Sequence, residues 1–309
     1  MKAGRTRPVR DRLAHAAALA SGALLTFALA RFAGEAAPAR AAAPAAGTVL
    51  REAVASDEPG RTQRNVRIWL PPGYDSPAAV NRRYPVVFLL HGWPGSDGNW
   101  MELGHAPEIA DSLAASGAIP EVILVFPNGN GTGLLGRSYW IDSYDGRCRL
   151  ETWLTRTLVP WVDGRFRTRR EPSARAIIGL SDGANAAFDL SLRHPDLFGA
   201  AAGHSGDYVL EKTFGCGAIY GPDPGADSIL AAHSPALYIG RVADVARRLR
   251  LYVDCGTGDE SISLTRAFHA RLDSLHIAHE YHEFPGSHSW SYWRQHLHQS
   301  LVAVTAGMR

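Results

Sequence analysis

The chain has 309 residues, 46% of them hydrophobic and 20% charged, with a formal net charge of +2. This is the composition of an ordinary globular protein, long enough for one α/β domain with a large core or at most two small domains. The arginines are scattered among acidic residues, so no basic patch indicates a nucleic-acid partner.

The N-terminal segment has the pattern of an export signal. Four arginines precede an apolar run from Leu13 to Ala30, and Ala/Pro-rich sequence follows. A basic head, an apolar middle and a small-residue exit are typical of a secretory signal, which could be cleaved after Ala30 or Ala41. An uncleaved N-terminal anchor is the alternative. We expect a secreted or extracytoplasmic protein with a leader and linker in residues 1–45 and a folded domain in residues 46–309.

The apolar pattern then predicts alternating strands and helices. Val66, Ile68 and Leu70 alternate with polar residues and stop at Pro71-Pro72, as in an edge strand. Apolar runs predict further strands over Tyr84–Gly92, Glu121–Gly129, Ala174–Ser181, Gly199–Gly206, Arg248–Gly256 and His276–Gly286. Helical periodicity falls between and after them, over Ala106–Ala115, Arg149–Phe166, Ala184–Leu192, Ser263–Leu275 and Trp290–Ala303.

Strands that alternate with helices predict an α/β fold with a doubly wound, mostly parallel sheet. Ligands bind such sheets at the carboxyl ends of the strands, where the main candidate residues lie. The Gly- and Pro-rich segment Asp207–Tyr238 is too long for a simple connection. We therefore expect it to form a short cap-like, substrate-facing insertion.

The candidate nucleophile is Ser181, within Gly179-Leu180-Ser181-Asp182-Gly183. Glycine and serine are ordinary turn residues, but this Gly-x-Ser-x-Gly pentapeptide follows a buried strand and opens a helix. That context predicts a nucleophile elbow, a sharp turn that lifts the hydroxyl clear of the backbone. Because serine is a poor nucleophile without a base, a histidine and an acid are required at the same edge of the sheet.

His288 is the candidate base, since it follows the last predicted strand in a loop. Other histidines lie within regular elements, among them His279, His282 and His296. In a fold with a nucleophile elbow of this kind, the acid lies between the serine and the histidine in the chain. The end of the preceding strand offers three carboxylates, those of Asp254, Asp259 and Glu260.

Two backbone amides are expected to form an oxyanion hole. One belongs to Asp182, the residue after the nucleophile, and the other to the loop after an early strand, where Trp93 is the candidate. Gly92 and Gly95 allow this loop to approach the nucleophile. His91 is expected to order the loop rather than to do chemistry.

In order and spacing, these segments resemble the esterase D-like family of α/β-hydrolases, which includes feruloyl and acetylxylan esterases, S-formylglutathione hydrolases and the antigen 85 mycolyltransferases. The resemblance covers roughly Val66 to Leu297. It is carried by the segments VRIWLPPGYD, YPVVFLLHGWPGSDGNW, RAIIGLSDGANAAFDLSLRHPDLFG, HSGDY, DCGTGDE and FPGSHSWSYWRQHL. It implies that Ser181 is the nucleophile, Asp259 the acid and His288 the base.

One position departs from the family pattern. Members commonly carry Met-Gly-Gly or a similar triplet after the serine, where this chain has Asp182-Gly183-Ala184. A carboxylate that pointed at the oxyanion would oppose the reaction. The first turn of a helix favours a carboxylate, so we expect the Asp182 side chain to turn away while its amide still donates.

The leading functional hypothesis is a secreted serine esterase that works through an acyl-enzyme. Acyl transfer to a sugar, as in the antigen 85 proteins, is the alternative, and an intact serine, histidine and acid set disfavours a non-catalytic binding protein. The expected partner is an ester, carbohydrate-linked or lipid-linked, with no cofactor, metal or obligate protein partner. Residues near the expected rim are tentative substrate contacts, namely His91, Trp100, Trp140 and Trp290.

The chain contains three cysteines, Cys148, Cys216 and Cys255. An odd number at wide spacing does not indicate a disulfide-stapled scaffold. If a disulfide forms, Cys148 with Cys216 is the expected pair, because both lie in loop-rich segments. Cys255 is expected to be a buried thiol at a strand end.

Overall fold

The computed structural model describes residues 47–131 and 136–308, so the predicted leader lies outside the described residues. The strands are β1 Thr48–Glu58, β2 Arg61–Leu70, β3 Val86–Leu90, β4 Ile123–Pro127, β5 Arg175–Leu180, β6 Ala200–His204, β7 Arg250–Gly256 and β8 Glu280–Phe284. The principal helices are α2 Ala106–Ala115, α3 Leu150–Thr152, α4 Val159–Arg165, α5 Asp182–Arg193, α10 Ile262–Ser274 and α11 Trp290–Thr305. Among these residues, no helix is long and apolar enough to cross a membrane.

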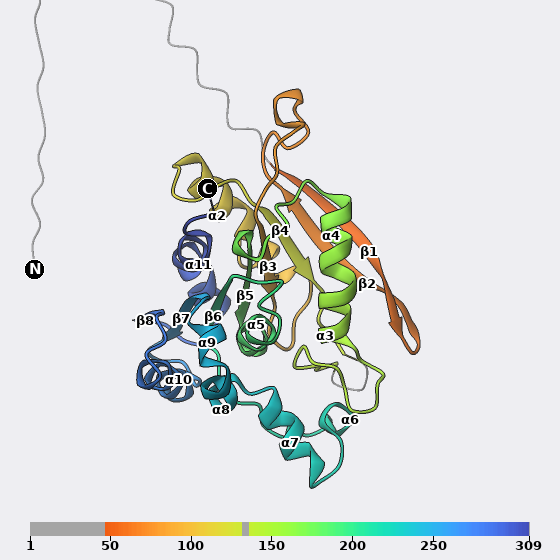
Figure 1. Ribbon diagram of the computed structural model, residues 1–309, viewed down its shortest axis with the longest axis vertical. Helices are drawn as coiled ribbons and strands as arrows, with labels where there is room; N and C mark the ends of the chain where they lie inside the picture. Colours follow the sequence, from red (N-terminus) through yellow and green to blue (C-terminus); the bar gives the residue numbers. More distant parts are fainter. Residues whose placement is uncertain (1–46, 132–135, 309) are drawn as a thin grey trace, which may run out of the picture. The chain divides into compact units, whose positions relative to one another are not determined.

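The strands form one sheet in the order β1-β2-β4-β3-β5-β6-β7-β8 (Figure 1). The pairs β1–β2 and β2–β4 are antiparallel, and every pair from β4 to β8 is parallel. The predicted doubly wound, mostly parallel sheet is confirmed. The prediction that β2 lies at the edge is wrong, because β1, which the apolar pattern did not reveal, pairs along its whole length.

Apolar residues on both faces of the central strands explain the layers around the sheet. In β3, Val86, Phe88 and Leu90 pack into one core with residues of α4, α5 and α10. Val87 and Leu89 point the other way and pack with residues of α2 and α11. Because both faces are covered, continuous apolar runs were the correct signal for these strands.

The helix predicted over Arg149–Phe166 is confirmed to within one residue at each end, because α3 begins at Leu150 and α4 ends at Arg165. It runs from α3 through a π-helical stretch, Trp153–Leu158, into α4. Pro160 lies where the π-helical stretch passes into α4.

The predicted insertion contains three short helices, α6 Gly217–Tyr220, α7 Gly225–Ala232 and α8 Pro235–Tyr238 (Figure 1, teal). Residues of α6 and α7 build a small apolar cluster, to which Tyr139 and Ile141 also contribute, whereas Tyr238 of α8 packs in the main core. The amide of Asn185, on α5, donates to the carbonyl of His233 at 3.1 Å. This contact ties the insertion to the helix that begins at the nucleophile.

The expected pairing of Cys148 with Cys216 is wrong, because both are free thiols that pack in different apolar clusters. Cys148 instead accepts a hydrogen bond from Arg64 at 3.6 Å. Cys255 is a fully buried thiol, as predicted, and burial raises its pKa to about 12.

Candidate active site

Ser181 lies on a strained turn between the buried strand β5 and helix α5. Its φ of 54° and ψ of −124° are unfavourable for a residue with a side chain, at a cost of roughly 1–3 kcal/mol. The flanking glycines make the turn possible. A Cβ on Gly179 would lie 1.9 Å from the carbonyl oxygen of Gly183, and one on Gly183 would lie 2.5 Å from that of Leu90. This is the geometry expected of a nucleophile elbow.

Ser181, His288 and Asp259 form a hydrogen-bonded line. The Nε2 atom of His288 lies 3.0 Å from the Ser181 hydroxyl, and its Nδ1 atom lies 3.0 and 3.2 Å from the two carboxylate oxygens of Asp259. An ionised carboxylate only accepts, so the proton of neutral His288 sits on Nδ1 and the lone pair of Nε2 faces the serine. The line can therefore take a proton from Ser181.

The loops after β7 and β8 bring Asp259 to the histidine. The amide of Gly258 donates to the carbonyl of Gly286 at 2.8 Å, which joins the two loops. The carboxylate of Asp259 also accepts the Ser261 amide at 2.9 Å. Of the other two carboxylates that the sequence left open, Asp254 is buried elsewhere and Glu260 is exposed.

The pKa shifts of His288 and Asp259 fit the transfer of a proton from Ser181 to His288. Burial on its own would lower the pKa of His288, but the hydrogen bond and the negative charge of Asp259 outweigh it and raise the pKa above its usual value of 6.5. Burial likewise opposes ionisation of Asp259, and the hydrogen bond from His288 lowers its pKa nonetheless. Each group thus stabilises the charged form of the other.

The loop after β3 passes directly over the nucleophile. A Cβ on Gly92 would lie 2.9 Å from the Cβ of Ser181, so only glycine allows this approach. His91 fastens the loop, because its Nδ1–H donates to the Gly92 carbonyl at 2.6 Å and its Nε2 accepts the Gly129 amide at 2.9 Å. Burial lowers the pKa of His91 to about 4, so the ring is neutral. Trp93 follows in the same loop.

The carboxylate of Asp182 is held by Arg137. The guanidinium donates two hydrogen bonds to it, at 2.6 and 2.8 Å, and a third to Thr213 at 3.0 Å. It also lies 4.3 Å from the centroid of the Tyr139 ring. As the first residue of α5, Asp182 has an amide with no partner inside the helix. The side chain is thus held and neutralised by Arg137, whereas the sequence led us to expect the free amides of the first turn to stabilise it.

The sequence did not reveal Arg137 as part of the site. It lies in an irregular loop, and no periodicity or motif marks it. The acidic residue after the nucleophile was the available signal, because a carboxylate beside an oxyanion site needs a compensating cation.

A cavity of about 190 Å³ opens beside the nucleophile. Its lining is mostly polar and includes Ser181, Arg137, Asp207, Glu211 and Thr213. Three of these residues come from the start of the predicted insertion, which therefore faces the site. The cavity suits a polar group better than a long alkyl chain.

Three of the four tentative substrate contacts are wrong. Trp100 is 1% exposed and Trp140 is 3% exposed, and their indole N–H groups donate to the carbonyls of Leu90 and His91. His91 is buried in the loop described above. These residues pack beneath the site. The prediction failed because the spacing of aromatic residues in the sequence does not distinguish residues at the rim from residues in the core. Trp290 is half-buried at the rim and packs edge-on against Trp100.

Known proteins are similar to this chain in sequence. The sequence model of the family described as "Putative esterase" matches residues 56–304. Esterase Rv1288 of Mycobacterium tuberculosis is 28% identical over 251 residues, which cover 72% of this chain and 52% of the relative. The diacylglycerol acyltransferase/mycolyltransferase Ag85A of the same organism is 25% identical over 207 residues, covering 52% of this chain and 58% of the relative. The chain thus spans about half the length of these curated relatives.

Solved structures extend the similarity to the fold. A ferulic acid esterase superposes with a TM-score of 0.75 at 26% identity, covering 84% of this chain and 98% of that chain. The sheet described above, with helices on both faces, is that of an α/β-hydrolase.

Proposed function

Because the chain belongs to the esterase family, whose sequence model spans residues 56–304, we propose that it is a secreted serine hydrolase that cleaves carboxylic esters through an acyl-enzyme. The observation that carries this proposal is the line from the Ser181 hydroxyl through His288 to Asp259. The export pattern at the N-terminus supports an extracytoplasmic location.

In the first half-reaction, the Ser181 oxygen attacks the carbonyl carbon of the ester and its proton passes to Nε2 of His288. The amides of Trp93 and Asp182 hold the oxyanion of the tetrahedral intermediate. His288 then gives the proton to the leaving alcohol, and the acyl group remains on Ser181. In the second half, His288 takes a proton from water as the water oxygen attacks the acyl carbon. The second tetrahedral intermediate then collapses, His288 returns the proton to the Ser181 oxygen, and the carboxylic acid leaves.

The cavity beside Ser181 favours substrates with a polar group next to the scissile ester. Asp207 and Glu211 provide acceptors for hydroxyl groups, and Arg137 and Thr213 lie in the same lining. An acylated sugar fits this chemistry better than a long-chain lipid. Similarity to Ag85A supports a second candidate, transfer of the acyl group from Ser181 to a sugar hydroxyl instead of water.

The test is a single panel of esters assayed with the purified chain. We expect turnover of p-nitrophenyl acetate and of acetylated and feruloylated sugars, with kcat/KM falling towards long-chain p-nitrophenyl esters. An acyl adduct on Ser181, trapped by acid quench and found by mass spectrometry, would support the mechanism. Product analysis with an added sugar acceptor separates hydrolysis from transfer. No turnover of any ester by the folded protein would refute the proposal.

A further inference from the structure

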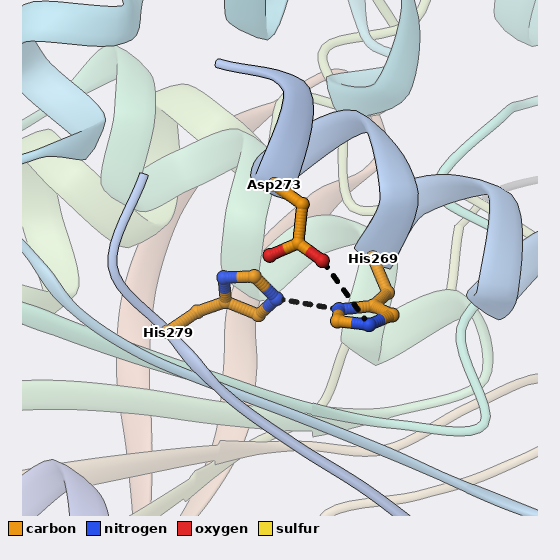
Figure 2. Close-up of side chains that lie close together, drawn as sticks. All are labelled: His269, Asp273 and His279. Carbon is orange, nitrogen blue, oxygen red and sulfur yellow. Dashed lines mark hydrogen bonds and ion pairs between the residues drawn. The ribbon is translucent and has the colours of Figure 1, made fainter. Parts of the chain in front are cut away.

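Three potential metal ligands that the proposed mechanism does not use, His269, Asp273 and His279, lie close together (Figure 2). His269 and Asp273 are one turn apart on α10, and His279 directly precedes β8. One ligand atom from each of the three residues lies within 4.8 Å of the others. We propose that this α10–β8 cluster binds one divalent transition-metal ion such as Zn²⁺, through a nitrogen of each histidine and the carboxylate of Asp273.

His279 is already in the tautomer that a metal ligand needs. Its Nδ1 atom lies 2.8 Å from the carbonyl oxygen of Ile277, which can only accept a hydrogen bond. Nδ1 therefore carries the proton, and the lone pair of Nε2 faces the cluster. Metal-bound histidines almost always make such a bond through the other ring nitrogen, because it fixes the orientation of the ring.

His269 contacts both of the other residues in the cluster. Its ring stacks on Tyr281 with centroids 3.9 Å apart. Its Nδ1 lies 2.7 Å from Nε2 of His279, and its Nε2 lies 3.4 Å from the carboxylate of Asp273. Since His279 Nε2 accepts, Nδ1 of His269 must donate, and a neutral ring then turns its remaining lone pair towards an anion. A metal ion placed between this ring and the Asp273 carboxylate would accept that lone pair.

The donor set indicates which metal fits. Two imidazoles and one carboxylate suit Zn²⁺ and its neighbours, whereas Ca²⁺ and Mg²⁺ prefer oxygen ligands. Atoms bound at about 2.1 Å to a tetrahedral ion lie roughly 3.4 Å apart. The two histidine nitrogens that lie 2.7 Å apart would therefore separate slightly to admit an ion, and the Asp273 oxygen, which lies within 4.8 Å, would move inward. The Asp273 side chain is 63% exposed, which leaves it free to move and leaves a coordination position for water.

Another group of possible ligands, Glu151, Asp189 and His233, does not offer the same opportunity. Glu151 accepts a hydrogen bond from Arg193 at 3.0 Å, and Asp189 accepts one from Tyr238 at 2.7 Å. His233 in turn contacts Asp189 at 2.7 Å. The charges of this second group are already compensated by these contacts, so we interpret the group as an ion-pair network.

The position of the α10–β8 cluster predicts a stabilising role. His279 lies at the amino end of β8, whereas His288 follows its carboxyl end, and five strand residues span about 17 Å. A metal ion would join the last turns of α10 to the entrance of β8 without contacting the nucleophile. Ester hydrolysis is therefore expected to be independent of the ion.

The test is calorimetric titration of Zn²⁺ into the untagged full-length chain after treatment with EDTA. We expect one ion per chain in the wild type and at least a tenfold loss of affinity in His279→Ala and in His269→Ala. His298→Ala is the control, because this exposed histidine on α11 lies outside the cluster. Affinity equal to wild type in the His269→Ala/His279→Ala double variant would overturn the proposal, as would a wild type that binds no Zn²⁺.

Thermal unfolding gives a second readout that does not depend on activity. Zn²⁺ at a hundred times its dissociation constant should raise the wild-type Tm by several degrees, and this rise should disappear in His279→Ala. Ca²⁺ and Mg²⁺ at the same concentration should leave the Tm unchanged. An equal Tm rise in wild type and variant would show that the ion binds elsewhere.

Discussion

Two hydrogen-bonded lines of serine, histidine and aspartate occur within residues 47–131 and 136–308. The first contains the Ser181 hydroxyl at the nucleophile elbow. In the second, Nδ1 of His204 lies 2.9 Å from the carboxylate of Asp254, and Nε2 lies 2.9 Å from the hydroxyl of Ser300. The residue types and distances are nearly the same. Their surroundings differ, and that difference indicates what makes such a line a candidate for catalysis.

The second line is completely buried between the sheet and α11. Ser300 sits inside that helix and its hydroxyl lies 3.0 Å from the carbonyl of Leu297, with no strained turn to expose it. Asp254 also accepts hydrogen bonds from Tyr252 and Tyr292. These contacts make it part of a buried polar network that holds α11 on the sheet. Access and a strained turn distinguish the Ser181 line from it.

The largest expected effect separates the two serines. Ser181→Ala should lower kcat for ester hydrolysis by about six orders of magnitude, as seen when triad nucleophiles are removed, and should leave the domain folded. Ser300→Ala should retain wild-type kcat and lose only about 1 kcal/mol of stability with its hydrogen bonds. Steady-state assays and urea unfolding of both variants test this. Comparable losses of kcat in the two variants would contradict the distinction.

The two aspartates should separate in the same way as the two serines. Asp259→Asn leaves His288 without its carboxylate, so turnover should fall about four orders of magnitude. Asp254→Asn disturbs three buried hydrogen bonds and should cost about 1–3 kcal/mol of stability while turnover per folded molecule stays near wild type. Glu260→Gln is the matched exposed control. A collapse of turnover in Asp254→Asn would reassign the acid.

Arg137 should matter through the charge it neutralises. In Arg137→Gln the Asp182 carboxylate is left without its guanidinium beside the developing oxyanion, so kcat should fall about tenfold to a hundredfold. Adding Asp182→Asn removes the charge and should recover most of the loss, which a double-mutant cycle measures. Additive losses would mean that Arg137 acts on the substrate instead.

The smallest effect is on the pH dependence. Attack requires neutral His288, whose pKa is raised above 6.5 by Asp259. As pH falls through that raised pKa, His288 becomes protonated and kcat/KM should decline. In Asp259→Asn the residual activity should decline at a lower pH, because the raising charge is gone. Asp254→Asn should leave the profile unchanged, and a shift there would place Asp254 in the active line.

Much of the fold was predictable because its strands are buried on both faces. Continuous apolar runs such as Tyr84–Gly92 mark such strands directly, and the Gly-x-Ser-x-Gly turn is a local constraint that sequence reveals. The strand β1 was missed, because a half-exposed edge strand has a weaker pattern. For the same reason β2 was wrongly placed at the edge.

The candidate site residues that lie in a loop directly after a strand could be predicted from the sequence. A residue whose partner is distant in the chain could not. His288 and Asp259 each follow a strand end, so chain order was sufficient to propose them. Arg137 lies 45 residues from Asp182, and only the folded chain brings them together. The sequence also did not show which aromatic residues are buried. Trp100 and Trp140 are of the residue type expected at the rim of a site, but they pack in the core.

The most direct test of the central claim is labelling with a fluorophosphonate probe, followed by peptide mass spectrometry. The probe reacts with an activated serine in an accessible site. We predict stoichiometric labelling of wild type at Ser181 alone, unchanged labelling of Ser300→Ala and none in Ser181→Ala. Labelling at Ser287, Ser289 or Ser300, or labelling that persists in Ser181→Ala, would contradict the account.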